Sequence, residues 1–535
     1  MSLNKNNTLY MDISSYRDSK TTALYFRKKK ISFSEFLERV DNMARYFKTY
    51  GIQKDDVVSL LSPNVPQAII AFYALNKIGA IVSVLHPLLP PKILLDSLEE
   101  VGSSHLLILD ARYFAYQKEL ENVNIPIHFL TASEDLTGFE NFMMRRKLKK
   151  ELSVVNHKKV LSTKKKRKIK GVEVETNEDN LKPSVLLRSG GTTGRNKNIV
   201  LNDYAVRYPG SVSLDIFAMD SFKGKSMLGV LPLFHGFGLA MGIHAPLMHE
   251  AASCLMIKYD EKELIKNIKQ GKVNSLICVP YMARKLLDNK AFKGKMLRNL
   301  IMSFVGADKP NPALFKEFDE RMKKAGSQNR LYEGYGLTET VTVTFVNTKV
   351  HHKEGSVGRP LTGTLVKIVD PNDLSKEVLI GKEGMILISS PANCLGYLNV
   401  SKRGQPFYTD RKKRKWVVTN DIGHLDEDGF LCFKNRIGDS FKIAGYNVYP
   451  SDIEKLADEV EGVVESAAIY IDGPRPYIHL FIENHTLKDQ VLGEAVLNHL
   501  RDYLLPYSVP RSITLLPKFP RTAIGKVDRK ALLKL

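Results

Sequence analysis

A short glycine-rich stretch, residues 189–197, has the residue types of a phosphate-binding loop. Its three glycines let backbone amides turn toward one point without interference from Cβ atoms, and its hydroxyl groups and the Lys197 ammonium add further donors for an anion. The Walker A loop is excluded, because that loop ends in glycine, lysine and serine or threonine and opens directly into a helix. Here Ile199, Val200 and Leu201 follow, which predicts a strand and places the stretch at the tip of a hairpin. On its own, such a stretch could equally be a surface turn.

Residues 333–339, Glu-Gly-Tyr-Gly-Leu-Thr-Glu, form a second candidate. Gly334 and Gly336 would admit a flat ring close to the backbone, and Tyr335 offers an aromatic face. Glu339 offers a hard oxygen ligand suited to magnesium. The alternative interpretation is a glycine turn flanked by a capped helix.

Two charged residues nearer the end of the chain extend the pattern. Asp421 follows Thr419 and Asn420, and a carboxylate is a natural acceptor for two ribose hydroxyls, although an aspartate beside glycine is usually a turn residue. Lys526 follows Gly525 in a basic tail. A positioned ammonium there would stabilise the charge that builds on phosphoryl oxygens when a carboxylate attacks an α-phosphate.

In this order the segments resemble the motifs of the adenylate-forming superfamily, which comprises acyl- and aryl-CoA synthetases, peptide-synthetase adenylation domains and luciferases. Residues 189–198 are similar to Ser-Gly-Ser/Thr-Thr-Gly-x-Pro-Lys-Gly, with Asn196 and Asn198 in place of proline and glycine. Residues 335–339 are similar to Tyr-Gly-x-Thr-Glu, and residues 520–529 to Pro-Arg-Thr-x-x-Gly-Lys-x-x-Arg. The matching segments extend over nearly the whole chain.

Two further segments match the family with a departure. In the segment that resembles Thr-Gly-Asp, Asn420 takes the place of glycine. In the segment that resembles the interdomain hinge, Arg436 matches, the hinge position is Gly438, and Asp439 comes one residue later than the usual aspartate or lysine. Glycine tolerates large changes of φ and ψ, so both Gly438 and Asp439 stay open as the hinge residue.

The resemblance implies an AMP-forming acid:thiol ligase that uses ATP, Mg²⁺ and CoA. ATP and a carboxylic acid would give acyl-adenylate and pyrophosphate, and the thiol of CoA would then displace AMP. The residues implied in catalysis are Thr192, Glu339, Lys442 and Lys526, of which Glu339 would also bind the metal ion. The residues implied in ATP binding are Ser189, Gly190, Gly191, Thr193, Gly194, Lys197, Gly306, Ala307, Glu333, Gly334, Tyr335, Gly336, Thr338, Asp421 and Arg436. The residues implied in binding the acid or the thiol are His235, Phe237, Val305 and Gly445.

The acid and its acceptor are less constrained than the reaction. The sequence shows no acidic partner for a substrate ammonium near His235, which favours a fatty or aryl acid over an amino acid. One alternative is a free-standing enzyme that loads an acyl carrier protein instead of CoA. A second alternative, a non-catalytic acyl-nucleotide sensor, is disfavoured because Lys526, Glu339 and Asp421 are all present.

The elements that would position these residues predict an α/β protein. A helix with Ser34 as N-cap, a buried strand at 56–61, a helix from Pro66 to Gly79 and a strand at 80–85 indicate parallel crossovers. Shorter strands divided by glycine and proline predict a β subdomain from about residue 363. We therefore expect a large N-terminal domain (1–436) of layered α/β subdomains plus a β subdomain. A small, mobile α+β C-terminal domain (437–535) would follow and would act as a lid that carries the catalytic lysine.

Cysteine content, apolar stretches and charge indicate the location and the partners of the protein. Four scattered cysteines without a Cys-x-x-Cys pair argue against a disulfide framework and a zinc site, and no apolar stretch suits a signal peptide or a membrane span, so we expect a cytoplasmic protein. The net charge of +21 is concentrated in residues 145–170, where thirteen lysines and arginines oppose one acid, Glu151. Without interleaved aromatic residues we expect no nucleic acid partner. The stretch is either a solvated excursion or a site that attracts anionic lipid or CoA, so peripheral membrane contact stays open.

Overall fold

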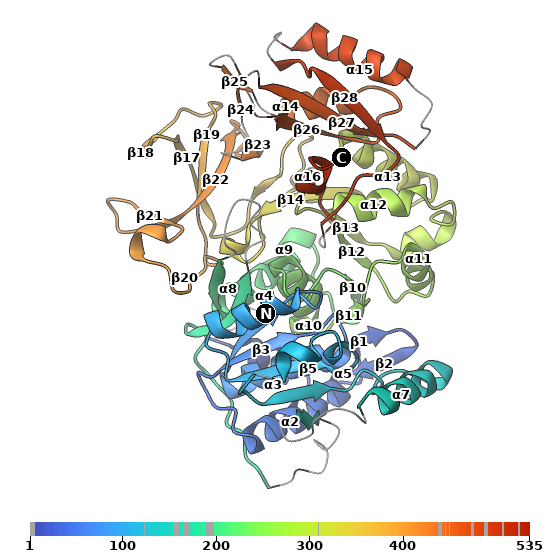
Figure 1. Cartoon of the computed structure of the whole chain (residues 1–535), viewed down its shortest axis with the longest axis vertical. Helices are drawn as coiled ribbons and strands as arrows, with labels where there is room; N and C mark the ends of the chain where they lie inside the picture. The colour runs from blue at the N-terminus through green and yellow to red at the C-terminus, as the bar shows by residue number, and fades with distance from the viewer. Residues whose placement is uncertain are drawn as a thin grey trace.

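The computed structural model, shown in Figure 1, describes residues 6–121, 123–152, 160–163, 169, 171–188, 197–308, 310–436, 441–443, 446–448, 450–471, 476–485, 490–504, 508–522 and 525–535. The predicted residues that lie outside these ranges are Ser189, Gly190, Gly191, Thr192, Thr193, Gly194, Gly438, Asp439 and Gly445. For Lys442 only the backbone is described, in strand β24 (Phe441–Ile443), which pairs with β25 (Tyr446–Val448).

The first α/β layer is built on an eight-stranded sheet. Its strands, in spatial order, are β20 (Gly396–Tyr397), β9 (Asn198–Asn202), β8 (Pro183–Arg188), β4 (Ile81–Leu85), β3 (Val57–Leu61), β5 (His105–Leu109), β6 (Ile127–Leu130) and β7 (Val160–Ser162). Neighbours from β8 to β7 pair in parallel, as the predicted crossovers require. β9 runs antiparallel to β8, which confirms the predicted hairpin arrangement of the two strands that flank the glycine-rich stretch.

Helices connect and cover this sheet. They are α2 (Phe33–Thr49), α3 (Pro66–Ile78), α4 (Pro91–Glu100), α5 (Asp110–Tyr113), α6 (Gln117–Leu120) and α7 (Gly138–Leu152), and the short α1 (Leu9–Ser14) precedes them. α3 begins at its proline and is capped by Gly79 at φ 87°, as predicted. The predicted N-cap of α2 is wrong: the cap is Ser32, whose side chain accepts a hydrogen bond from the Glu35 N–H at 3.2 Å. Ser34 already lies in the first helical turn, where a residue cannot serve as the cap.

The second α/β layer is built on a nine-stranded sheet. Its strands, in spatial order, are β16 (Arg359–Pro360), β15 (Val343–Val346), β14 (Leu331–Gly336), β13 (Met302–Val305), β12 (Ser275–Cys278), β10 (Ser226–Gly229), β11 (Ala252–Leu255), β1 (Thr22–Phe26) and β2 (Lys29–Ser32). Its helices are α8 (Asp203–Ser211), α9 (Ser213–Phe217), η2 (Phe237–His244), α10 (Ala245–Met248), α11 (Glu261–Lys269), α12 (Pro280–Asp288), η3 (Gly294–Asn299) and α13 (Pro312–Lys324). The central strands β11 to β14 run parallel, so the predicted motifs at the ends of β13 and β14 lie at one edge of the sheet.

An antiparallel sheet forms the predicted β subdomain and continues to Arg436. Its strands are β17 (Leu365–Asp370), β18 (Asp373–Glu377), β19 (Gly384–Ser389), β21 (Phe407–Thr409), β22 (Lys415–Leu425) and β23 (Leu431–Arg436). β22 is the longest of them, and its middle carries Asp421, which is paired in register with Arg436 of β23. The sheet therefore brings these two predicted residues side by side.

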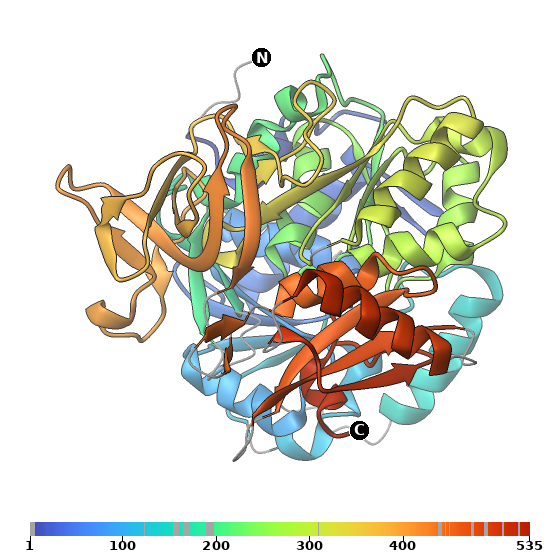
Figure 2. The same ribbon diagram turned by 90° about the horizontal axis from the view of Figure 1, so that it is seen from above.

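The C-terminal region has a separate sheet of three strands and its own apolar core. Its elements are α14 (Pro450–Asp458), β26 (Glu465–Ile471), β27 (Tyr477–Glu483), α15 (Gln490–Tyr503), β28 (Ser512–Leu516) and α16 (Arg529–Leu532). Figures 1 and 2 show this region, in red, lying over the second layer beside α12 and α13. The predicted α/β fold with a small α+β C-terminal part is confirmed. The boundary at residue 436 and the mobility of the C-terminal part stay predictions.

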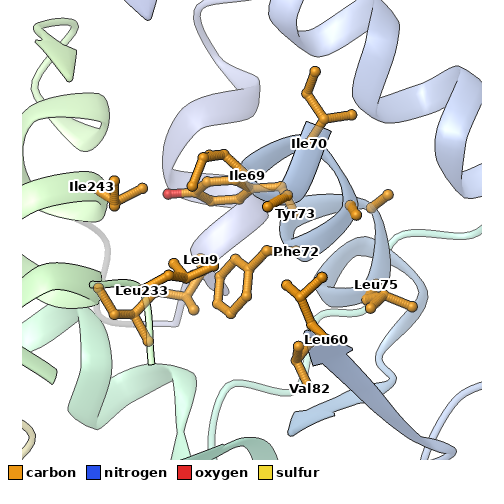
Figure 3. Close-up of a cluster of buried hydrophobic side chains, with 14 of the residues drawn as sticks. Leu9, Leu60, Ile69, Ile70, Phe72, Tyr73, Leu75, Val82, Leu233 and Ile243 are labelled. Carbon is orange, nitrogen blue, oxygen red and sulfur yellow. The ribbon is translucent and has the colours of Figure 1, made fainter. Parts of the chain in front are cut away.

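The largest core joins the first layer to the strand end that carries His235. Figure 3 shows Phe72 and Tyr73 of α3 between the strands of the first sheet and two residues of the second layer, Leu233 and Ile243, which belong to the same buried cluster. The four cysteines are free, and Cys254, Cys278 and Cys394 are buried. In the part of the chain that the structure describes, no helix is long and apolar enough to cross a membrane.

Candidate active site

One cleft between the second layer, the antiparallel sheet and the C-terminal region collects the predicted residues. Those that line it are Lys197, His235, Phe237, Val305, Gly306, Ala307, Glu333, Gly334, Tyr335, Gly336, Thr338, Glu339, Asp421, Arg436 and Lys526. They come from sequence positions more than three hundred residues apart, so the fold, and not local sequence, brings them together.

A buried carboxylate forms one corner of the cleft. Asp421 accepts hydrogen bonds from the Arg436 guanidinium, with Nε at 2.7 Å and a terminal nitrogen at 3.3 Å, and from the Tyr335 hydroxyl at 2.6 Å. Burial raises the pKa of Tyr335 well above its usual range, and the adjacent Asp421 adds to the shift, so the hydroxyl stays protonated and donates. Burial alone would lower the pKa of Arg436, but the Asp421 carboxylate outweighs it and the pKa is raised. A carboxylate fixed in this way keeps lone pairs for further donors.

The departure at Asn420 has a backbone explanation. Asn420 lies at φ 57°, in the left-handed region that favours glycine. Asparagine is, after glycine, among the residues that most readily adopt this conformation. Asn420 therefore keeps the backbone conformation of β22 beside Asp421, even though the family motif has glycine there.

The glycines of 334–336 have a packing role in addition to the predicted one, which stays a prediction. A Cβ atom on Gly336 would lie 1.7 Å from the carbonyl oxygen of Thr342, and one on Gly334 would lie 3.2 Å from the Val343 side chain. Both directions lead into the neighbouring strand β15. The Tyr335 ring stacks on Phe433, with centroids 5.7 Å apart. Close packing of two strands thus requires at least Gly336, whatever ligand approaches the other side.

The acidic residue proposed for the metal ion lies beside the described end of the glycine-rich stretch. Glu339 Oε1 accepts a hydrogen bond from the Tyr397 hydroxyl at 2.7 Å, and the Lys197 ammonium lies 4.4 Å from the centroid of the Tyr397 ring. Burial and the neighbouring carboxylate raise the pKa of Tyr397, which keeps its hydroxyl a donor. Sequence reasoning missed Tyr397, because its only local signal is a glycine-tyrosine pair at the end of a short strand.

The turn that carries Glu339 is strained and tightly packed. Val341 has φ 62°, which is unfavourable for a β-branched residue. Its carbonyl oxygen would lie 1.6 Å from a Cβ atom on Gly236, so Gly236 lets the His235 segment pack directly against this turn. The backbone of one predicted motif therefore supports the other.

His235 is positioned by a buried asparagine that sequence reasoning also missed. Asn64 donates to the carbonyl oxygens of Gly229 (3.1 Å) and Leu231 (2.8 Å) and accepts from the Leu233 N–H, which fixes the strand end before His235. The Phe237 N–H donates to Nδ1 of His235 at 3.3 Å. Burial, with a contribution from the Lys526 charge, lowers the pKa of His235 to about 4. His235 is therefore neutral near pH 7 and lies within the field of Lys526.

Lys526 sits on a small hairpin of the C-terminal region. Arg521 and Val527 form a β-bridge, and the Thr522 N–H donates to the Lys526 carbonyl at 2.8 Å. Arg521 is anchored to Glu465 (2.6 Å) and Glu483 (3.0 Å) within its own region.

The same hairpin touches the second layer at the start of α12. The Arg521 guanidinium lies 4.6 Å from the centroid of the Tyr281 ring, and a Cβ atom on Gly525 would lie 3.2 Å from Val279. This contact holds the hairpin at the point where Lys526 enters the cleft.

Behind His235 the cleft is apolar. The side chains that line it there are Ile216, Phe217, Phe237, Met241, Ile277, Phe304 and Val305. They continue into a buried aromatic row, in which the ring centroids of Phe217 and Phe304 are 5.5 Å apart and those of Phe304 and Tyr332 5.8 Å. Phe237 begins the π-helix η2, a rare conformation that recurs at functional sites. The apolar surface suits the hydrocarbon part of an acid.

Comparisons with known proteins agree with this geometry. The family model described as AMP-binding enzyme matches residues 12–398. The chain is 27% identical over 520 residues to 2-succinylbenzoate–CoA ligase of Listeria monocytogenes serotype 4b (strain F2365), covering 96% of each chain. It is 26% identical over 530 residues to long-chain-fatty-acid–CoA ligase of Bacillus subtilis (strain 168), covering 96% of this chain and 91% of the relative. The fold matches ATP-bound MatB from Rhodopseudomonas palustris with a TM-score of 0.83 at 20% identity, over 99% of both chains. Since the family model spans most of the chain, the protein belongs to the AMP-binding enzymes, among their AMP-forming acyl-CoA synthetases.

Proposed function

We propose that the protein activates an apolar carboxylic acid, fatty or aryl, with ATP and transfers the acyl group to CoA. The observation that carries the proposal is that Lys526 and His235 line the same cleft as the polar corner at Asp421 and the apolar side chains, with Lys526 close enough for its charge to act on His235. The polar part offers the Asp421 corner and Glu339, and the apolar part offers aromatic and aliphatic side chains that include Phe217 and Phe304. A carboxyl group at this junction would meet the nucleotide phosphates.

Different residues of the cleft would bind the ribose, the adenine and the phosphates of ATP. Asp421 would accept the ribose hydroxyls with the lone pairs that Arg436 and Tyr335 leave available. Tyr335, Gly306 and Ala307 line the part of the cleft beside it, where an adenine ring would lie. Lys197 and Thr338 would contact phosphate oxygens, together with the predicted hydroxyl and glycine residues of 189–194.

The cleft fits a magnesium ion that is held largely by substrate. Among the described residues, no three His, Cys, Asp or Glu side chains are grouped closely enough to hold a metal ion. Mg²⁺ commonly takes one or two carboxylates together with substrate phosphates and water, and Glu339 supplies one carboxylate. When bound, the ion would neutralise charge on phosphate oxygens. The Tyr397 hydroxyl would orient the Glu339 carboxylate.

Two transfers would follow. In the first, a carboxylate oxygen attacks the α-phosphorus, the bond from that phosphorus to the bridging oxygen breaks, and pyrophosphate leaves while the Lys526 ammonium stabilises the developing charge. In the second, the deprotonated thiol sulfur attacks the acyl carbon and AMP leaves. We propose that the C-terminal region turns between the steps about Gly438 or Asp439, so that Lys442 and the Gly445 segment replace the Lys526 hairpin.

The test is acid-dependent pyrophosphate exchange with a panel of acids. The panel contains fatty acids of graded chain length, substituted benzoates and amino acids. We expect exchange with members of the first two classes and little exchange with amino acids, because the apolar wall offers no partner for an ammonium group. Exchange with amino acids alone would contradict the proposed substrate class. The product step is then tested with CoA and with an acyl carrier protein as separate acceptors, and transfer to the carrier alone would favour the alternative function.

A further inference from the structure

Helix α7 (Gly138–Leu152) presents apolar side chains on two of its faces. One face packs on the protein, where Leu148 is 2% exposed and Met144 contacts the core of the first layer. The other face carries Phe139, Phe142 and Met143, whose exposed fractions are 76%, 59% and 46%. These three positions follow the i, i+3, i+4 spacing of one helix face. The helix therefore exposes an apolar strip that the described part of the protein does not cover.

Basic side chains border this strip on the same helix. Arg145, Arg146, Lys147 and Lys149 are all exposed. They begin the stretch 145–170, whose sequence has thirteen basic residues against one acid. Even the part with described side chains thus combines apolar and positively charged surface.

A second basic segment lies beside the helix. Residues 27–30, which comprise the turn between β1 and β2 and the start of β2, have the sequence Arg27-Lys28-Lys29-Lys30. Arg27 forms an ion pair with Glu140 of α7 at 2.8 Å. The exposed Lys28 and Lys30 therefore extend the positive surface across from the helix. Figure 1 shows α7 beside β2 at the edge of the molecule, away from α15 and α16. A partner on this surface would leave the C-terminal region uncovered.

Another exposed apolar pair shows what is distinctive here. Leu379 and Ile380 are 78% and 69% exposed, but their neighbours in sequence, Lys376, Glu377, Lys382 and Glu383, carry both signs of charge. The surface around α7 joins comparable apolar exposure to mainly positive charge, and its exposed acid Glu140 is paired with Arg27. That combination is complementary to a bilayer with anionic headgroups, which offers hydrocarbon beneath a negative surface.

We propose that α7, together with residues 27–30, docks on a bilayer that contains anionic lipid. Phe139, Phe142 and Met143 enter the boundary between headgroups and acyl chains, and the basic residues contact lipid phosphates. A duplex nucleic acid offers negative charge but no hydrocarbon layer, so it would leave the apolar strip of α7 without a partner. Docking would hold the enzyme at a surface into which apolar acids partition.

The test measures binding of the full-length protein to vesicles of phosphatidylcholine and of an equimolar mixture with phosphatidylglycerol. We expect binding to the mixed vesicles that weakens with added salt. The variant Phe139→Ser/Phe142→Ser/Met143→Ser should lower the partition coefficient by about tenfold or more. The variant Arg145→Glu/Arg146→Glu should lower it by about fivefold for each unit of charge removed.

Matched controls exist elsewhere on the surface. Leu379→Ser/Ile380→Ser matches the apolar change, and Arg411→Glu/Lys412→Glu, on another exposed basic turn, matches the charge change. Both controls should bind vesicles like the unchanged protein, and all variants should keep pyrophosphate exchange in the absence of lipid.

Three outcomes would overturn the proposal. The first is vesicle binding that the α7 variants do not change. The second is an equal loss in the control variants. The third is binding to duplex DNA that depends on the basic residues but not on the serine substitutions, since that would identify a general polyanion surface. If no acid in the panel supported pyrophosphate exchange, the vesicle-binding results could still be interpreted, because vesicle binding requires no catalysis.

Discussion

The two halves of the cleft are held in different ways. On the nucleotide side, Asp421 is bound by side chains from two other strands, at 2.6 Å and 2.7 Å, and Gly336 and Gly236 let backbones approach more closely than any other residue allows. On the C-terminal side, Lys526 sits on a hairpin anchored mainly within its own region by Arg521, Glu465 and Glu483. The first half is built into the packed fold, and the second is placed against it.

This difference suits a site that binds before it catalyses. Asp421 and Glu339, for which we propose roles in binding ribose and the metal ion, keep their geometry through hydrogen bonds within one packed body. The contacts that the described part of the hairpin makes with that body include the cation–π contact of Arg521 with Tyr281 and the close approach of Gly525 to Val279. We infer that nucleotide binding is preformed and that the charge for catalysis is delivered by docking.

We expect the largest loss of activity when Lys526, on the hairpin of the C-terminal region, is replaced. Lys526→Ala should reduce acid-dependent pyrophosphate exchange by roughly a hundredfold to a thousandfold, because a single positioned donor to the transition state is lost. Affinity for ATP should change little, since Asp421 and Glu339 are untouched, and transfer from preformed acyl-adenylate to CoA should persist. The control is Lys534→Ala, an exposed lysine near the chain end. Unchanged exchange in the Lys526 variant would remove this residue from the mechanism.

We expect a smaller effect when a hydrogen bond on the nucleotide side of the cleft is removed. Tyr397→Phe removes the hydroxyl that donates a hydrogen bond to Glu339 at 2.7 Å. It keeps the aromatic ring over which the Lys197 ammonium lies. A hydrogen bond to a charged group contributes about 1.5–3 kcal/mol, so the KM for Mg²⁺ should rise about tenfold or more. Titration of exchange activity with Mg²⁺ measures this, with Tyr408→Phe as a control tyrosine outside the cleft lining. An unchanged Mg²⁺ requirement would contradict the role given to Tyr397.

The docking contact itself should have a moderate effect. Tyr281→Leu removes the ring under Arg521, and cation–π pairs contribute about 0.5–2 kcal/mol, so adenylation should fall about two- to thirtyfold. Tyr281→Phe keeps the aromatic face and should stay near full activity. CoA transfer from preformed adenylate should be the same in both variants, because the hairpin is not needed there. If transfer fell together with adenylation, the contact would be structural and not a positioning contact.

The fold and the grouping of the site residues follow from different signals in the sequence. The fold follows from local signals, such as the buried run of α3 with its proline start and Gly79 end. The grouping of 335–339, Asp421 and Lys526 follows from motif order, and all of them line the cleft. The roles assigned to these residues remain predictions.

What the sequence missed are partners that tertiary contacts create. Tyr397 reaches Glu339 across 58 positions, and Asn64 reaches Leu231 across 167, with no periodicity to mark either. Ser32 and Ser34 precede the same helix, and only backbone geometry distinguishes the cap. The φ of Asn420 is equally invisible in the sequence, so its departure from glycine could not be recognised as conservative.

The smallest effect tests most directly whether the two halves meet. Burial and the Lys526 charge hold the pKa of His235 at about 4, below its ordinary 6.5. Lys526→Ala should raise this pKa, because removing a positive charge makes protonation easier, while burial keeps it below 6.5. NMR titration of labelled histidine, assigned with His235→Gln, measures the change, and Lys534→Ala should leave the pKa unmoved.

The same shift has a consequence for stability. With a lower pKa in the folded protein, the unfolded chain binds more protons as pH falls from 6.5 toward 4, so His235 makes folding less favourable across that window. The penalty should be smaller in Lys526→Ala than in the unchanged protein, which denaturant unfolding at graded pH can measure. An identical His235 pKa in both proteins would mean that the Lys526 charge does not lie near His235 in solution. The preformed and delivered halves would then meet only after substrate binds.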